Sequence, residues 1–351
     1  MIFIAFLLSA LIAAALPLNT PAQSFPSRPV RIVVPYPVSG PNDIHGAPRL
    51  SRTDRVIARN APPSISDVLA QITIYSIQAD TTQPVVLDRL PGATTVRGTQ
   101  AVASAPADGH TLLIASNRTI VINPEYFSGA AYDAARELVP VAPLATMPFV
   151  LLSRTAVPAL TTGDLVAWLR RRPGEVNYGS SGEGSTGNLV GELFRRSARV
   201  NVVHASFDGG VAALNGLAQG QVSFAFAAAP LALAHLPNAY FRPLAVSGAK
   251  RMERLPGVGT FAEAGLHGVE AEGWYAVFAR RGTRPAALAW LAEHVGSTVN
   301  EPATRVRLLA AGLEPATLSN ELFVARIQVE QEQWSPVLRA SRPAWREKND
   351  G

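Results

Sequence analysis

The sequence contains no cysteine among its 351 residues. This absence excludes disulfide bonds, a thiol nucleophile, cysteine-based metal sites and a lipidated cysteine behind a leader sequence. The fold must therefore be stabilised by its hydrophobic core. The chain is long enough to build one large or two medium α/β domains.

Charged residues are scarce, at 16% of the chain against 48% hydrophobic residues, which is typical of a compact globular protein. The net charge of +5 comes from arginines that are scattered along the chain, with no basic stripe interleaved with aromatic residues. We therefore expect no nucleic-acid partner. No two of the six histidines have H-x-x-x-H spacing, so we expect no metal site and no cofactor.

Long apolar runs are missing after the N-terminus. Residues 1–22 carry no charge, and residues 2–16 form an apolar run that is too short for a comfortable membrane span. Thr20-Pro21-Ala22 offers a small-x-small cleavage site, which predicts a signal peptide over residues 1–22 and a secreted, soluble protein. The lack of Lys or Arg before the apolar run leaves a mis-assigned start codon or an uncleaved anchor as alternatives.

The most distinctive stretch present is residues 176–194, in which a short strand leads through a Gly/Ser-rich loop into a helix. Such a loop exposes backbone N–H groups that have no partner inside the helix, at the positive end of the helix dipole. Hydroxyl groups add further donors without bulk. We therefore predict that a small carboxylate binds here, at Ser180, Gly184, Ser185 and Thr186.

Three other interpretations of the loop remain. Residues 182–187 fit G-x-G-x-x-G, but the expected next strand, near residues 200–203, is followed by His204 and only later by Asp208, whereas dinucleotide binding needs an acid closing that strand. A secreted α/β serine hydrolase could use loop 179–187, but no serine there fits G-x-S-x-G. The loop could also be an ordinary αβ connection. We predict no enzyme activity and no catalytic residue.

A second junction of this kind follows the strand expected at residues 28–35. The loop from Tyr36 to Ile44 combines Gly, Pro and small polar residues, and Asn42 or Asp43 could cap a following helix. Loops at the carboxyl ends of strands are where open α/β sheets bind ligands. We therefore add Tyr36, Pro37, Ser39, Gly40, Asn42 and Asp43 to the candidate site.

An ordered series of short motifs between residues 25 and 334 resembles the Bug receptors, the solute-binding proteins of tripartite tricarboxylate transporters. The family usually has Pro-Phe-Pro-x-Gly-Gly-x-x-Asp where this chain has residues 35–43, and its third strand ends in Ser-Asn, as at Ser116-Asn117. Further matching segments are residues 83–93, 107–117, 177–194, 204–210, 220–222, 244–247 and 251–265.

The resemblance implies an α/β, type II-like periplasmic binding fold of two lobes, with a mainly parallel sheet in each lobe and a ligand cleft between them. It implies lobe 1 over residues 25–142 and 247–351, and lobe 2 over 143–246. It also implies a monomeric periplasmic receptor for a small carboxylate, with membrane transporter subunits as possible partners and hinge closure on binding. Ser116, Asn117 and Gly209 join the candidate ligand-binding residues.

Four departures from the family pattern affect the site. Ser39 replaces a Gly, and a segment of about residues 45–66 is additional. Because of this segment, the acid that serves the first ligand loop is either Asp43 or Asp67. Asp43 adjoins the loop, whereas Asp67 has the family spacing. Residues 72–77 are β-branched and predict a poor helix. Ala227 and Ala228 stand where Asp and Asn are usual, which favours a plain carboxylate over an amino acid. Arg118, in place of a Gly, could pair with that carboxylate or face solvent.

The remaining pattern alternates strands and helices. A strand over residues 138–152 is expected to cross into the second lobe, and helices are expected at 162–169, capped by Thr162, and at 285–299, 302–311 and 321–338. In the last helix we expect Leu322, Ile327 and Trp334 to pack inward and Glu330 to point outward. His204 is expected in the core or behind the site rather than in catalysis.

Overall fold

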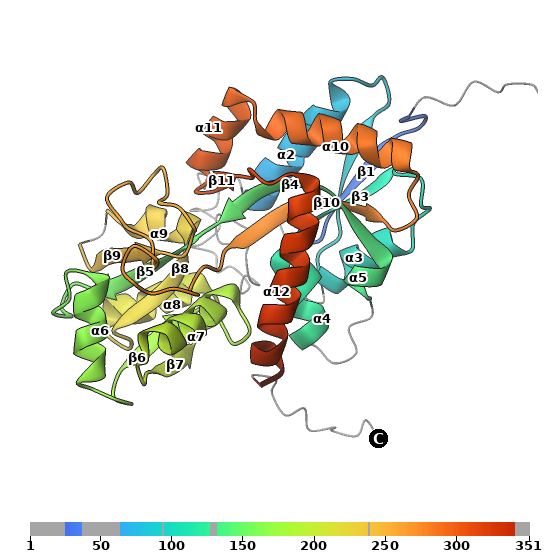
Figure 1. Cartoon of the computed structure of the whole chain (residues 1–351). Coiled ribbons are helices and arrows are strands. Elements are labelled where there is room, and N and C mark those ends of the chain that lie inside the picture. The colour runs from blue at the N-terminus through green and yellow to red at the C-terminus, as the bar shows by residue number, and fades with distance from the viewer. Residues whose placement is uncertain (1–24, 37–63, 93–94, 127–131, 238, 341–351) are drawn as a thin grey trace, which may run out of the picture.

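The computed structural model describes residues 25–36, 64–92, 95–126, 132–237 and 239–340, which form two α/β lobes, each built around its own sheet (Figure 1). The first sheet has the strand order β11-β4-β10-β3-β1-β2, and the second has the order β7-β6-β8-β5-β9. The predicted two-lobe α/β fold is therefore confirmed. The signal-peptide prediction falls on residues outside the described ranges.

The first sheet takes strands from both ends of the chain. β1 pairs in parallel with β2 and β3, whereas β10 is antiparallel to β3 and β4, and β11 is antiparallel to β4. Its strands are β1 (Val30–Val34), β2 (Val85–Arg89), β3 (Thr111–Ser116), β4 (Leu138–Met147), β10 (Gly273–Arg280) and β11 (Glu314–Pro315).

Helices cover this first sheet. α2 and α10 pack against each other, while α12 packs against the π-helical turn η2 and against α4 (Figure 1). The elements are α2 (Ile65–Gln78), α3 (Val96–Ala103), η2 (Arg118–Ile122), α4 (Asn123–Tyr126), α5 (Ala134–Glu137), α10 (Pro285–Val299), α11 (Pro302–Ala310) and α12 (Asn320–Ala340).

The helix α2 corrects one prediction. Its second half contains the β-branched residues that we expected to disfavour a helix, yet it is helical to Gln78. Ile72, Thr73 and Ile77 are all buried, and Thr73 donates its hydroxyl to the carbonyl of Leu69 at 2.9 Å. Burial of one helix face against the sheet outweighs intrinsic propensities, which differ by well under about 1 kcal/mol per residue.

The second sheet is built from the middle of the chain. β6 is parallel to β7 and β8, and β5 is antiparallel to β8 and β9. Its strands are β5 (Phe149–Arg154), β6 (Asn177–Ser180), β7 (Val203–Ser206), β8 (Phe224–Ala228) and β9 (Phe241–Val246), and its helices are α6 (Thr162–Arg170), α7 (Thr186–Ala198), α8 (Gly210–Gln219) and α9 (Ala229–His235).

Both sheets are mixed, so the expectation of mainly parallel sheets was wrong. The strands that break the parallel pattern are those that carry the chain between the lobes. β4 and β5 are separated by Pro148 alone and run from the first sheet into the second, whereas β9 and β10 bring the chain back. Because outgoing and returning strands run side by side, they must pair antiparallel. β4 stays in the first sheet to Met147, past the expected lobe boundary at 142. Our division into lobes otherwise stays a proposal.

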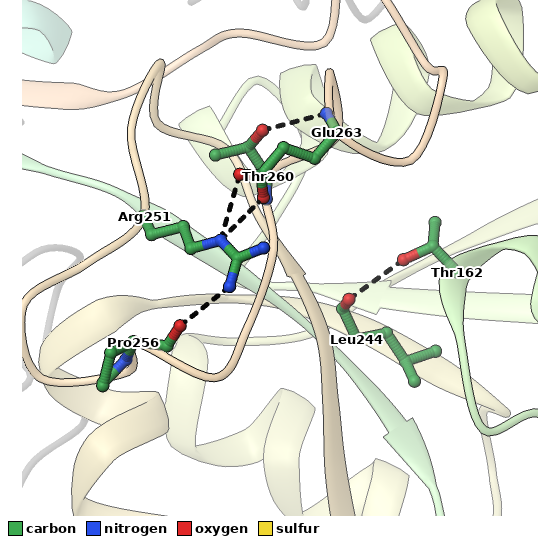
Figure 2. A network of polar contacts seen from close by, with 6 residues as sticks. All are labelled: Thr162, Leu244, Arg251, Pro256, Thr260 and Glu263. Carbon is green, nitrogen blue, oxygen red and sulfur yellow. Dashed lines mark hydrogen bonds and ion pairs between the residues drawn. The ribbon is translucent and has the colours of Figure 1, made fainter.

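The start of α6 is fixed at two points. Its N-cap is Thr161 rather than the expected Thr162, and Thr161 forms a reciprocal capping box with Asp164. Thr162 instead donates its hydroxyl to the carbonyl of Leu244 in β9 at 3.0 Å (Figure 2). The helix is therefore tied to the strand that returns toward the first lobe.

The segment between β9 and β10 is shaped by one arginine and one glutamate. Arg251 donates its Nε to both carboxylate oxygens of Glu263, at 3.0 and 2.9 Å, and its Nη1 to the carbonyl of Pro256 at 3.0 Å (Figure 2). Glu263 also accepts from the backbone N–H of Thr260 at 2.8 Å. The hydrogen bond from Thr260, followed by the one from Arg251, lowers the pKa of Glu263. These contacts hold the return loop in one conformation.

The orientation of α12 corrects another prediction. Glu330 points inward and is 6% exposed, whereas Leu322 is 59% exposed. Glu330 accepts hydrogen bonds from Nε1 of Trp274 and Nε of Arg326, both at 2.8 Å. A buried indole N–H needs an acceptor, and the carboxylate supplies it. The buried apolar residue near the start of the helix is Phe323 instead of Leu322.

Candidate functional site

The carboxyl ends of strands in the two sheets are directed toward each other. Ser116, the last residue of β3, pairs with Tyr275 near the start of β10, where the chain has just returned from the second lobe. Ala228, the last residue of β8, pairs with Phe149, where the chain has just left the first lobe. Loops after β1, β3, β6 and β8 therefore lie on the facing sides of the two lobes, which is where α/β sheets bind ligands.

The first lobe contributes a buried hydroxyl network. The hydroxyl of Tyr36 accepts from the backbone N–H of Ser116 at 2.8 Å and donates to Oγ of Ser116 at 3.0 Å. It also lies 3.3 Å from Oγ1 of Thr119. Burial raises the pKa of Tyr36, while its bonds to Ser116 and the nearby Arg118 oppose that shift. The phenol is therefore a neutral link that joins the ends of β1 and β3.

Asn117 is occupied by its surroundings. Its Oδ1 accepts from the N–H of Arg118 at 3.0 Å and so caps η2, and its Nδ2 donates to the carbonyl of Glu272 at 3.3 Å. The residue is 2% exposed. Asn117 therefore holds η2 against the strand that returns from the second lobe, and Arg118 opens η2 close to Tyr36.

The first ligand loop is only partly described. Five of its predicted site residues lie outside the described residues: Pro37, Ser39, Gly40, Asn42 and Asp43. Asp67, the other candidate acid, lies in the first turn of α2, where it accepts from the hydroxyl of Ser64 at 2.8 Å and forms an ion pair with Arg89. The charge of Asp67 is thus already matched by a neighbouring guanidinium. The choice between Asp43 and Asp67 stays open.

The Gly/Ser-rich loop of the second lobe is held by its own side chains. Oγ of Ser180 lies 2.8 Å from Nε2 of His204 and donates to the carbonyl of Gly182 at 3.1 Å. Ser185 is the N-cap of α7 and accepts from the N–H of Asn188 at 3.1 Å. The N–H of Gly184, whose φ is +65°, donates to Oδ1 of Asn188 at 3.2 Å.

Two backbone donors at the start of α7 come next. Thr186 and Gly187 begin α7, and within the described ranges neither N–H has an acceptor. Thr186 is 3% exposed. A Cβ on Gly187 would lie 2.9 Å from the carbonyl oxygen of Phe226, so only glycine allows this close approach to β8. The first turn of α7 thus carries backbone donors of the kind that bind an anion.

The helix α8 adds a second positive helix end. It begins beside α7 because β6 and β7 are adjacent and parallel. Its N-cap is Gly209, with φ of +95° and no side-chain capping bond. Two helix N-termini at one sheet edge favour negative charge there.

Sequence reasoning missed two residues that shape the loop. Asn188 donates its Nδ2 to the hydroxyl of Tyr178 at 3.2 Å in addition to fixing Gly184, and Ser206 accepts from the N–H of Glu183 at 3.1 Å. The spacing from Ser185 to Asn188 is that of a cap and its third helical residue, which could have indicated the first of these. Nothing local to the sequence places Ser206 against Glu183, because strand pairing brings them together.

The pair Ser180 and His204 does not amount to a catalytic arrangement. Ser180 is fully buried, and burial lowers the pKa of His204, which keeps its imidazole neutral. In the described part of the chain no carboxylate hydrogen-bonds to the other ring nitrogen of His204; its ring instead lies 5.0 Å from that of Tyr178. His204 therefore positions Ser180. The same part of the chain holds no cluster of His, Asp or Glu suited to a metal ion.

The profile of one protein family, the tripartite tricarboxylate transporter family receptors, matches residues 70–342. The chain belongs to this receptor family. Protein BugT of Bordetella pertussis is 28% identical over 321 residues, covering 91% of this chain and 90% of BugT. The resemblance to the Bug receptors is thereby confirmed. Within the described residues, no helix has the length and apolarity needed to cross a membrane.

Solved structures share the fold. Rpa4515 of R. palustris, determined with adipate, is 28% identical with a TM-score of 0.69, covering 90% of this chain and 98% of that one. MatC from Rhodopseudomonas palustris, determined with malate, is 26% identical with a TM-score of 0.64, covering 90% of this chain and all of its own.

The family also decides between the earlier alternatives. The strand after α7 is β7, Val203–Ser206, rather than residues 200–203, so Asp208 follows it closely and our spacing argument against a dinucleotide was wrong. The receptor family, and not that spacing, now disfavours the dinucleotide and hydrolase interpretations. Solute-binding receptors capture a ligand without transforming it.

Proposed function

We propose that this receptor captures a small carboxylate between its lobes in the periplasm and presents it to the membrane subunits of a tripartite tricarboxylate-type transporter. Related receptors of known structure carry adipate and malate. Each is a carboxylate, and the facing strand ends of this chain offer backbone donors of the kind that a carboxylate requires. The predicted signal peptide, residues 1–22, supports export to the periplasm.

The observation that carries the proposal is the two N–H groups of Thr186 and Gly187, which lie at the positive end of α7 and have no acceptor among the residues that the structure describes. A carboxylate oxygen would accept from these donors, and the N-terminus of α8 after Gly209 adds to the positive potential. Ser180, Gly184 and Ser185 set the conformation of this loop.

On the first lobe, Tyr36 and Ser116 would form the opposing wall, with Arg118 close enough to the Tyr36 hydroxyl to affect its pKa. Asn117 supports that wall through η2. The remaining predicted contacts, Pro37, Ser39, Gly40, Asn42 and Asp43, complete the proposed site from the loop after β1. Rotation of the lobes about their connecting strands would enclose the ligand.

The proposal is tested by thermal denaturation of the purified protein against mono-, di- and tricarboxylates, amino acids and nicotinamide nucleotides. A ligand at one hundred times its Kd stabilises the folded state by about 2.7 kcal/mol, which raises Tm by several degrees. We expect a rise with one class of carboxylate. A rise in Tm with nucleotides alone would refute the proposal. So would the absence of any rise with carboxylates at concentrations up to about 10 mM, which is 10,000-fold above a micromolar Kd.

A further inference from the structure

A small cavity lies in the second lobe at the carboxyl end of β8, between β8, α8 and α9. Its volume is about 30 Å³. Every side chain that lines it is uncharged, and one hydroxyl, that of Ser181, is present among alkyl and aromatic groups. The residues that line it include Phe149, Ser181, Gly210, Ala213, Ala227 and Leu231.

The cavity adjoins the proposed carboxylate site. Ser181 directly follows β6 and begins the Gly/Ser-rich loop, and Gly210 is the first residue of α8. Ala227 and Ala228 end β8, next to the point where Phe149 begins β5. The loops that would hold the carboxylate therefore also form one wall of the cavity, so a substituent on the same ligand can reach it.

Alanine and glycine create this space. Ala213 and Ala227 are 4% and 5% exposed and face the cavity from α8 and β8. At Gly210 a Cβ would come within 2.6 Å of Cδ2 of Leu231. Larger residues at these positions would fill the cavity, and an acid at the end of β8 would give it a charge.

The chemistry of the walls selects what can enter. A volume of about 30 Å³ accommodates one or two carbon atoms. An ammonium or second carboxylate would lose its hydration there with the Ser181 hydroxyl as the one polar side chain in the lining, whereas an alkyl group gains from leaving water. Transfer of one methylene from water corresponds to about a fourfold gain in affinity.

We propose that this receptor prefers carboxylates with a short apolar substituent, of one or two carbons, over ligands of the same length that carry an ammonium or hydroxyl group there. The inference rests on the proposed function, because the carboxylate must first be anchored at α7. It names the class of substrate that the same site selects.

The test compares ligands that differ at one position, by calorimetric titration of the full-length protein. One series is succinate, 2-methylsuccinate, malate and aspartate, and a second is propionate, 2-methylpropanoate, lactate and alanine. We expect the methyl compound to bind about fourfold tighter than its unsubstituted parent in the series that binds, and the amino acid to bind at least tenfold weaker than the methyl compound.

Two variants change the cavity in opposite directions. Ala213→Val should fill it and abolish the methyl advantage, while Leu231→Val should enlarge it and favour 2-ethylsuccinate or 2-ethylpropanoate. Leu217→Val is the matched control, since Leu217 is fully buried in the same core but does not line the cavity. It should lose comparable stability and keep the wild-type ligand preference.

The outcomes separate this inference from the function beneath it. If no carboxylate binds, the proposed function fails. If carboxylates bind but the amino or hydroxy compound binds as tightly as the methyl compound, the receptor function stands and the apolar preference is wrong. If Leu217→Val alters the preference as much as Leu231→Val, the cavity is not the cause.

Discussion

The two sides of the proposed site differ in how their polar groups are used. On the first lobe, the hydroxyls of Tyr36, Ser116, Thr119 and Thr95 bond to one another or to nearby backbone. On the second lobe, side chains fix Gly184 and Ser185, and the N–H groups of Thr186 and Gly187 have no acceptor in the described part of the chain. One side is a closed network that supports strand ends, and the other is an open set of donors.

This difference separates stability from affinity. Changes on the first lobe should mainly affect the free energy of unfolding, because they break bonds that the folded protein makes with itself. Changes at the start of α7 should mainly affect ligand affinity, because its donors become paired only with a ligand. The variants below test that separation.

The largest effect is expected from Gly184→Val. Gly184 has φ of +65°, and a β-branched residue there is strained by about 1–3 kcal/mol, so the loop should abandon the conformation that aligns the N–H groups of α7. We expect carboxylate binding to be lost while the circular dichroism spectrum is retained. Titration calorimetry on the wild type and the variant measures the difference.

The matched control is Gly268→Val. Gly268 has a similar φ of +78°, a Cβ there would meet nothing within 4 Å, and the residue lies in the return segment between β9 and β10. It imposes comparable strain away from the first turn of α7, because the neighbouring carbonyl of His267 accepts from Ser197 in the last turn of that helix. The affinity of this variant should therefore equal that of the wild type. Equal loss of binding in both variants would mean that general strain, and not loop geometry, is responsible.

On the first lobe, Tyr36→Phe should reduce the free energy of unfolding. The change leaves the buried N–H of Ser116 without its acceptor, which costs about 1–3 kcal/mol. Urea denaturation should show a lower midpoint with an unchanged m-value. The control Tyr75→Phe removes a hydroxyl from a side chain that is 57% exposed, and it should be neutral. A Tyr36→Phe variant as stable as wild type would show that the network contributes nothing.

On the first lobe, Glu272 makes the free energy of unfolding depend on pH. Glu272, whose carbonyl accepts from Asn117, has a side chain that is 18% exposed, and burial raises its pKa from 4.5 to about 7 despite the nearby Arg326. The folded protein therefore binds this proton more tightly than the unfolded chain. The stability that comes from this tighter proton binding at Glu272 is fully present below pH 4.5 and is lost as pH rises toward 7.

Glu272→Gln tests this dependence. Relative to wild type, the variant should gain stability between pH 5 and 7, by at most about 1.4 kcal/mol per pH unit. Urea midpoints measured across this range would give the slope. Glu263→Gln is the control: hydrogen bonds lower the pKa of Glu263, so it stays ionised in this range and the variant should keep the wild-type slope. Parallel curves for Glu272→Gln and wild type would contradict the raised pKa.

Sequence patterns predicted the alternation of elements well, because apolar periods and caps are local. Patterns in the sequence correctly placed the Gly/Ser-rich loop, the helix α10 and the crossing between the lobes that runs through Pro148. The failures depend on distant partners. Glu330 is buried because Trp274, far away in the chain, needs an acceptor, and the antiparallel pairs arise because the chain crosses between lobes twice.

The predicted site shows the same limit. Glycines and serines indicated the donor loop, but not which donors stay unpaired, since Asn188 and Ser206 take two of them after the fold forms. Likewise, the choice between Asp43 and Asp67 could not be made from spacing. Arg89, at the end of β2, pairs with Asp67 because α2 packs against β2 in the folded protein.

The smallest effect is expected from two variants that each remove a helix cap, Ser185→Ala at α7 and Thr161→Ala at α6. Each removes a side-chain acceptor from a helix N-terminus, and each should cost about 1 kcal/mol of stability. Only α7 starts at the proposed site, so Ser185→Ala should also weaken carboxylate binding severalfold as the first turn loosens, whereas Thr161→Ala should not. Calorimetric titration beside urea denaturation separates the two effects. If the two variants lose affinity equally, the first turn of α7 has no special part in binding, and the contrast between the two lobes fails.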